Sequence, residues 1–256
     1  MVRYSFPSSI AEYFEFVALV RYPIVAVLLI IEFYLMFTII KGLWSARNLS
    51  GDPRLHVIDK YQGDDKKLAL ALPFAWEPAS WYYAIPKFSH QHPIKITNLS
   101  LWSAHWLHWL SLMLGSALIA GVSYYLLVDW SELAAIIVSS FVIYGVIFLT
   151  ANYRVAQHFT VYLTEDELVI NNAFFGIMKI KLTEISAIKA VDWQTGNNEE
   201  QLFLGKGKRG NIELIFTQQQ TYFGMMGQFP TEVEKIILHV EEPKKIIEAI
   251  TTFHSS

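Results

Sequence analysis

Two apolar runs lie near the middle of the chain, LHWLSLMLGSALIAGVSYYLLV (residues 107–128) and LAAIIVSSFVIYGVIFLTA (133–151), and only DWSE (129–132) separates them. The two apolar runs contain no charged residue. Each has about the 20 residues that a helix rising ~1.5 Å per residue needs to cross a hydrocarbon core of ~30 Å. A helix of a soluble core would carry polar residues along its outer face, and neither run has them. We therefore predict a transmembrane helical hairpin, helices 2 and 3, over residues 105–152.

A third apolar run, Tyr22–Ile40, is interrupted only by Pro23 and Glu32. It is longer than the apolar region of a signal peptide, no basic segment precedes it, and no small-residue cleavage site follows. We predict that residues 22–42 form transmembrane helix 1. Residues 1–21 combine a capping-box start with apolar residues at helical spacing, which predicts an amphipathic interfacial segment.

The composition places the membrane portion first and a water-soluble portion second. Apolar residues make up 53% of the chain, while half of the twenty Lys and Arg residues lie at or beyond Arg154. This leaves room for one domain of about 100 residues at the C-terminus. The formal net charge of −3 gives no electrostatic case for nucleic-acid binding. Because there is no cysteine, disulfides, thiolate nucleophiles, Cys-ligated zinc and iron–sulfur clusters are excluded.

Basic residues predict the topology. Several lie in the loop 43–104, and the tail after the hairpin opens with Arg154, whereas the turn Asp129–Glu132 has none. Basic residues near span ends stay on the cytoplasmic side. We therefore expect a multi-pass protein of the cytoplasmic (inner) membrane, with its N-terminus outside and its C-terminal domain, residues 153–256, in the cytoplasm.

Tryptophans and prolines mark the loop 43–104. Seven of the eight tryptophans precede residue 131, and several flank the predicted span ends, as in an interfacial aromatic belt. The stretch Leu68–Trp102 is too apolar for a free linker and too broken by proline for a span. We expect it to lie along the cytoplasmic membrane surface, and a surface that binds another protein is the alternative.

Beyond Gln157 the hydrophobic period changes from helical to alternating, which predicts antiparallel strands with one buried face. Turn signals such as Thr195-Gly196-Asn197-Asn198 separate the runs. The expected strands number about seven and lie around residues 159–163, 168–170, 179–182, 187–193, 201–204, 212–216 and 236–240. A closing helix follows, with Pro243 in its first turn and one apolar face, Ile246, Ile247, Ile250 and Phe253.

Seven short strands followed by one helix resemble the pleckstrin-homology (PH) superfold. The segment Tyr162–Gly176 resembles the opening of bacterial PH-like domains, Ile180–Ile188 resembles the following strand, and Val240–Ile246 resembles the final strand-to-helix junction. The resemblance implies a mainly-β PH-like domain fused to membrane spans, without a catalytic residue set. Some such proteins act on other membrane proteins. This chain departs from the pattern at 211–240, where Gln218–Gln220 and Gly224–Gly227 are expected to enlarge the loop before the last strand.

Glu32 lies about midway through the predicted first span. An ionised carboxylate there costs at least about 2.5 kcal/mol, so something must offset the cost. Three interpretations remain open: a hydrogen bond inside the bundle, for example to Ser116 or Ser139; contact with a span of a partner subunit; or a proton or ion path.

His105 and His108 lie three residues apart at the start of the second span, and imidazoles at this spacing can converge on one metal ion. No acidic residue or cysteine is near enough to complete a ligand set, so interfacial anchoring is the alternative.

Lys206, Lys208 and Arg209 form a basic turn between glycines. Such a turn can contact anionic lipid headgroups, or it can simply keep an exposed loop soluble. The first hairpin of the domain carries Glu165, Asp166 and Glu167, which argues against specific phosphoinositide recognition.

Together these features predict a non-enzymatic accessory subunit or assembly factor of a larger bacterial membrane complex, without a cofactor. The expected partners are other integral membrane proteins and membrane lipids. Small residues in the second span, Gly115, Ser116, Ala117, Ala120 and Gly121, are also compatible with a homo-oligomer. The alternative function is a small transporter or ion-pathway component that uses Glu32. No phosphate-binding loop, dinucleotide fingerprint, zinc-protease motif or nucleophile elbow occurs in the sequence.

Overall fold

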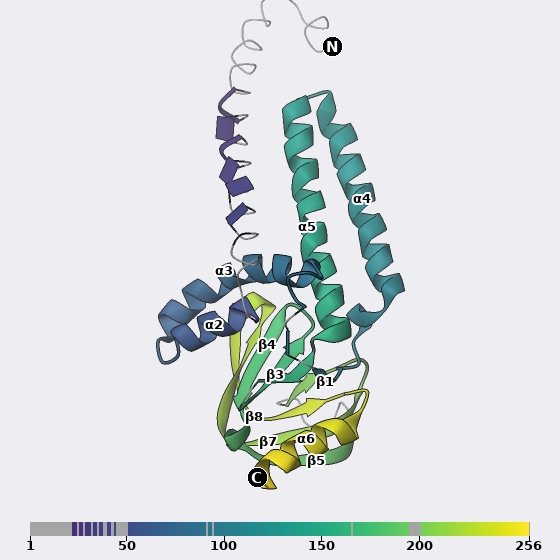
Figure 1. The fold of residues 1–256 in the computed structure, drawn as a ribbon. Helices are drawn as coiled ribbons and strands as arrows, with labels where there is room; N and C mark the ends of the chain where they lie inside the picture. The colour runs from purple at the N-terminus through teal and green to yellow at the C-terminus, as the bar shows by residue number, and fades with distance from the viewer. Residues whose placement is uncertain are drawn as a thin grey trace, which may run out of the picture. The chain divides into compact units, whose positions relative to one another are not determined.

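The computed structural model describes residues 22–24, 26, 27, 29–31, 33, 34, 36, 37, 40, 41, 44, 51–90, 92, 93, 95–164, 166–194 and 201–255 (Figure 1). They form two compact units. One holds the described residues of 1–41 together with 115–145, and the other holds those of 42–114 together with 146–256. The predicted loop 43–104 thus contributes its described residues to the same unit as the C-terminal strands.

The first unit contains residues 115–128, the C-terminal part of α4 (Trp106–Val128), and residues 132–145, the N-terminal part of α5 (Glu132–His158). Both helices are long and apolar enough to cross a membrane. Within this unit they are joined through small residues, since Ala134 and Ala135 are buried and Ser139 Oγ donates to the Ala120 carbonyl at 3.0 Å. Large apolar side chains such as Leu118 and Tyr125 remain exposed, as lipid-facing residues would be.

The described residues between 22 and 44 are helical. Glu32, the acidic residue near the middle of the predicted first span, lies outside the described residues. Ser139, one of the two serines considered as its partners, donates a hydrogen bond to the Ala120 carbonyl within the hairpin.

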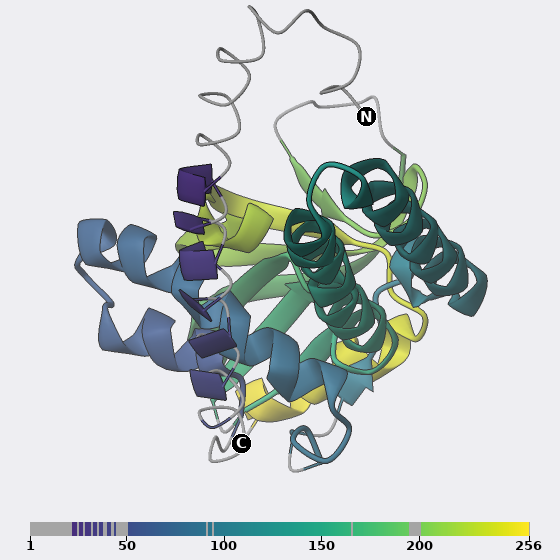
Figure 2. The same ribbon diagram turned by 90° about the horizontal axis from the view of Figure 1, so that it is seen from above.

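Two of the helices of the second unit, α2 (Pro53–Lys60) and α3 (Asp65–Ala84), lie side by side (Figure 2). Asp52 and Asp64 cap them, each accepting a hydrogen bond from a backbone N–H of the first turn. The prolines of the stretch Leu68–Trp102, which argued against a span, do not interrupt its helix, because α3 continues through Pro73 and Pro78. Its buried residues Leu72, Trp76, Ala79 and Tyr83 recur at helical spacing, and packing of this face outweighs the local cost of the prolines.

The same unit contains an eight-stranded sheet in the order β1-β2-β3-β4-β7-β8-β6, with β5 paired to β7. The strands are β1 (Lys95–Thr97), β2 (Val161–Leu163), β3 (Glu167–Asn172), β4 (Gly176–Lys181), β5 (Ile185–Gln194), β6 (Leu202–Leu204), β7 (Arg209–Gly224) and β8 (Phe229–Leu238). Short 3-10 helices η2 (Trp102–Ala104), η3 (Leu182–Glu184) and η4 (Met225–Gly227) interrupt the chain, and α6 (Pro243–Ser255) ends it.

Seven of these strands, β2 to β8, follow residue 158 and are followed by α6, as predicted for the described part of this region. Three expectations are corrected. The strands were expected to be antiparallel, but β6 pairs with the outer edge of β8 in parallel. This pairing sets Leu204 opposite Leu238, and both side chains belong to the core. β1, which precedes α4 in the chain, also joins the sheet. Finally, Gln218–Gln220 lie inside β7 rather than in a loop, since β7 and β8 form one long hairpin.

The sheet has an apolar cluster on each side of β2–β4. On one side Val161, Leu168 and Ile170 pack with Ile246 and Ile250 of α6. On the other side Tyr162, Val169 and Ile177 pack under α2 and α3. Alternation along the strands assigns successive side chains to opposite clusters, which explains why both helical layers are needed to cover the sheet.

Candidate functional site

The pairing of β7 is interrupted in its middle. On one edge β4 pairs with β7 only at Ile177↔Phe223 and Met178↔Tyr222, and β5 resumes the pairing at Ile185↔Phe216. On the other edge the register with β8 shifts between Ile215 and Gln220. Residues 217–219 therefore have no ladder partner on either edge within the described sheet. An unpaired strand segment must satisfy its backbone groups by other contacts.

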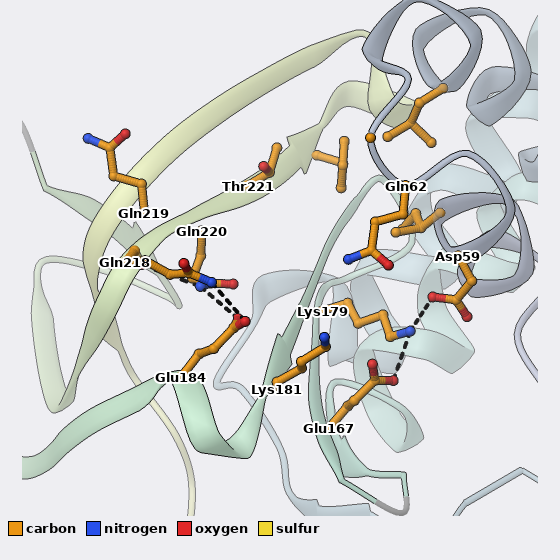
Figure 3. Close-up of a pocket in the computed structure, with 14 residues that line it drawn as sticks. Asp59, Gln62, Glu167, Lys179, Lys181, Glu184, Gln218, Gln219, Gln220 and Thr221 are labelled. Carbon is orange, nitrogen blue, oxygen red and sulfur yellow. Dashed lines mark hydrogen bonds and ion pairs between the residues drawn. The ribbon is translucent and has the colours of Figure 1, made fainter.

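A polar cleft of about 260 Å³ opens at this interruption, between the α2–α3 turn and strands β3, β4 and β7 (Figure 3). Its polar lining residues come from α2 and the following turn (Asp59, Gln62), β3 (Glu167), β4 (Lys179, Lys181), η3 (Glu184) and β7 (Gln218, Gln219, Gln220, Thr221).

Lys179 joins the two sides of the cleft. Its Nζ forms ion pairs with Asp59 Oδ1 on α2 and, at 2.8 Å, with Glu167 Oε2 on β3. The Lys179 side chain is 14% exposed, and that of Asp59 is 54% exposed. Burial alone would lower the pKa of Lys179, but its contacts with the two carboxylates outweigh that effect and raise the pKa above its usual value. The ammonium therefore stays charged at neutral pH.

Glu184 holds the other end of the cleft. Gln218 Nε2 donates to Glu184 Oε1 at 2.8 Å, and Gln220 Nε2 donates to Glu184 Oε2 at 2.9 Å. The Thr217 hydroxyl donates to the Glu184 carbonyl at 3.2 Å. These bonds bridge β7 to η3 where the backbone ladder is missing. The cleft thus presents amide, carboxylate and ammonium groups beside an open strand edge, a combination suited to binding a polar extended segment.

A second cavity of about 290 Å³ shares Asp59, Glu167 and Lys179 with the cleft. It is also lined by Tyr162, whose buried hydroxyl has no hydrogen-bond partner among the described residues. Burial raises the pKa of this phenol well above its usual value, so the hydroxyl remains protonated.

A buried ion pair supports both cavities. Arg54 Nη2 and Nε donate to the Asp52 carboxylate at 2.6 to 3.1 Å, and the Tyr83 hydroxyl donates to Asp52 Oδ2 at 2.8 Å. Arg54 also donates to the Phe174 carbonyl at 2.8 Å and to Asn171 Oδ1 at 3.0 Å. Both charged side chains are fully buried. This network fixes the start of α2 to β3 and to the β3–β4 turn.

The Arg54 guanidinium also lies among three aromatic rings, with Cζ 5.3 Å from the ring centroids of Trp76 and Phe174 and 5.4 Å from that of Tyr83. Burial by itself raises the pKa of Asp52, but the Arg54 charge and hydrogen bonds outweigh it, and the net pKa lies below the usual value. The pair is therefore ionised at neutral pH.

The residues singled out in the sequence lie elsewhere. His105 Nε2 is 3.1 Å from Lys206 Nζ, and His108 is exposed. Within the described ranges, no group of three or more His, Cys, Asp or Glu residues is placed to hold a metal ion. Lys206 and Lys208 lie in the turn between β6 and β7, with Arg209 at the start of β7.

Sequence reasoning missed the Asp52–Arg54 network and the ion pairs of Lys179 with Asp59 and Glu167, called the Lys179 clamp below. One signal was available, because Asp52 followed by Pro53 is a typical helix start. The partners of Lys179 depend on how α2 is placed against the sheet and have no local signature. The chain matches no protein-family model, and no curated protein or solved structure matches it.

Proposed function

We propose that this chain is a non-catalytic accessory subunit or assembly factor of a larger membrane complex, and that the cleft around Lys179 receives an extended segment of the partner protein. The observation that carries the proposal is the stretch 217–219 of β7, which lacks ladder partners on both edges beside an open polar cleft. Extended peptides bind such edges through backbone hydrogen bonds, while neighbouring side chains select among sequences.

The charges of the cleft favour binding over catalysis. Lys179 is paired with two carboxylates, and Glu184 accepts hydrogen bonds from two amides. Lys181 is exposed and has no ion-pair partner among the described residues. A partner segment that carries a carboxylate would find a counter-charge at Lys181 and amide donors along β7.

The proposal also includes membrane anchorage and a PH-like fold. Three spans would anchor the chain, with α4 and α5 as two of them, and the sheet unit would face the cytoplasm. The exposed apolar surface of the hairpin and the basic residues flanking it support this arrangement. The seven strands after residue 158 and α6, which packs against β1 and β5, support the PH-like assignment.

Site-specific photocrosslinking of the full-length chain in native membranes tests the docking role. A photoreactive amino acid at Gln219 or Thr221 should yield the same membrane-protein adduct, and the exposed α6 position Thr251 should not. Lys181→Glu should reduce the yield at least tenfold, whereas Lys189→Glu, which makes the same charge change at an exposed position on β5, should leave it unchanged.

Equal adducts at all three positions, or an unchanged yield in Lys181→Glu, would contradict docking in the cleft. Anchorage is tested separately by alkaline extraction of membranes. Release of the chain into the supernatant would contradict the spans without deciding the role of the cleft.

A further inference from the structure

The turn between β6 and β7 is held tightly against its neighbours. Gly205 adopts a φ of 152°, and a Cβ at this position would lie 2.5 Å from the Cβ of His239. Gly207 has a φ of 83°, a conformation that glycine adopts without strain. His239 Nδ1 lies 3.1 Å from the Lys206 carbonyl. The turn therefore presents its basic side chains from a fixed backbone.

Lys206 connects this turn to the start of α4. Its Nζ lies 3.9 Å from the centroid of the Trp102 ring and 3.1 Å from Nε2 of His105. An ammonium has only donors, so His105 Nε2 accepts this bond. Trp102 belongs to η2, and His105 directly precedes α4. Two segments that are about a hundred residues apart in the chain thus form one surface.

That surface is both basic and apolar. Trp102, Trp106 and Leu107 are 63%, 59% and 62% exposed. No ion pair involves Lys206 or Arg209 within the described part of the chain. The first turn of α4 carries no acidic side chain, and its N-terminal end is favourable for a negative charge.

We propose that the β6–β7 turn and the start of α4 bind the phosphate of an anionic phospholipid. The proposal rests on the membrane anchorage of α4 argued above. The apolar run of α4 begins at this surface, so Lys206, Lys208 and Arg209 lie at the level of the headgroups. Exposed indoles beside them fit the boundary between headgroups and acyl chains. A soluble anion such as inorganic phosphate has no acyl chains and so provides no such boundary.

Native mass spectrometry of the full-length protein in non-ionic detergent tests this site. The probes are short-chain phosphatidylglycerol, short-chain phosphatidylcholine and inorganic phosphate. Phosphatidylglycerol should bind at least tenfold more tightly than the other two. Each lost charge should weaken its binding about fivefold, so the variant Lys206→Gln/Lys208→Gln/Arg209→Gln should bind it roughly a hundredfold more weakly.

The control variant Lys66→Gln/Lys189→Gln/Lys244→Gln removes the same charge from exposed positions elsewhere and should bind as the wild type does. Trp102→Leu retains every charge and should weaken binding severalfold through loss of the Lys206 contact. Equal binding of the two phospholipids, equal binding of inorganic phosphate, or equal losses in the two triple variants would overturn the proposal. Membrane extraction of the triple variant, which should remain membrane-bound, separates this result from a failure of anchorage.

Discussion

Arg54 and Lys179 both fasten α2 to the sheet, but they do so in opposite environments. Both side chains of the Arg54–Asp52 pair are 0% exposed, and the guanidinium also donates to the Phe174 carbonyl and to Asn171 Oδ1. Lys179 is 14% exposed and lies between Glu167 at 18% and Asp59 at 54%. The first pair is sealed under α3, whereas the second lines an open cleft (Figure 3).

The exposure of each ion pair decides whether its charges are available for binding. A buried ion pair contributes little net stability compared with apolar side chains, yet removing one partner leaves a buried charge without compensation. A partly exposed pair can exchange a protein partner for a ligand at small cost, because water already competes for it. We therefore infer that Arg54 stabilises the fold and that Lys179 is available to a ligand in the cleft.

The largest effect is expected for Arg54→Met. The Asp52 carboxylate would remain buried without its counter-ion, and the free energy of unfolding should fall by about 3–5 kcal/mol. Denaturant titration in detergent, followed by near-ultraviolet circular dichroism, measures this change. The double variant Asp52→Asn/Arg54→Met removes both charges. Its free energy of unfolding should fall by less than the sum of the decreases in the two single variants. A loss below about 1 kcal/mol in Arg54→Met would remove the distinction between the two pairs.

The acid dependence of stability should come next. The pKa of Asp52 in the folded protein lies below its usual value of 3.8, because the Arg54 charge and hydrogen bonds outweigh the effect of burial. The stabilisation is therefore complete above pH 3.8 and is lost as the pH falls through the folded-state pKa. At neutral pH the Asp52→Asn variant should have a lower free energy of unfolding than the wild type. On acidification its free energy of unfolding should fall by less than that of the wild type. Parallel slopes below pH 4 for wild type and variant would contradict this assignment of the pKa.

Lys179→Met should have a smaller effect on stability than on binding. Asp59 and Glu167 would lose their shared cation, but Asp59 is half exposed, so the free energy of unfolding should fall by about 1 kcal/mol. In Lys179→Met the crosslinking yield from position 219 should fall by a larger factor than the yield from an unrelated position, because α2 is no longer held across the cleft. The titration used for Arg54→Met measures the first quantity. A stability loss as large as that of Arg54→Met would show that the cleft is structural.

Much of the fold was predictable from the sequence because its signals are local. The apolar runs predicted α4 and α5, and alternation at Val161, Leu168 and Ile180 predicted strands. The missed helix α3 carries a helical stripe through Leu72, Trp76 and Tyr83, yet Pro73 and Pro78 hid it. A proline disfavours a helix locally, and only the burial of this stripe against the sheet reverses the preference.

The candidate site was not predictable in the same way. Glu167 and Lys179 lie on adjacent strands, and their contact depends on the β3–β4 register. Asp59 reaches them only because the Arg54 network places α2 on the sheet. The parallel position of β6 beside β8 likewise depends on the core around Leu204. Such non-local contacts leave no periodic signal in the chain.

The smallest effect is expected for Lys245→Met, at the start of α6. Lys245 Nζ lies 2.8 Å from Glu242 Oε2, as short as the Lys179–Glu167 contact, but the two side chains are 58% and 53% exposed. If burial rather than distance sets the strength of these pairs, the free energy of unfolding should change by less than about 0.5 kcal/mol. The same denaturant titration provides the measurement. A loss matching that of Lys179→Met would mean that solvent exposure does not separate the clamp from an ordinary surface pair, and the assignment of Lys179 to the cleft would then depend on crosslinking alone.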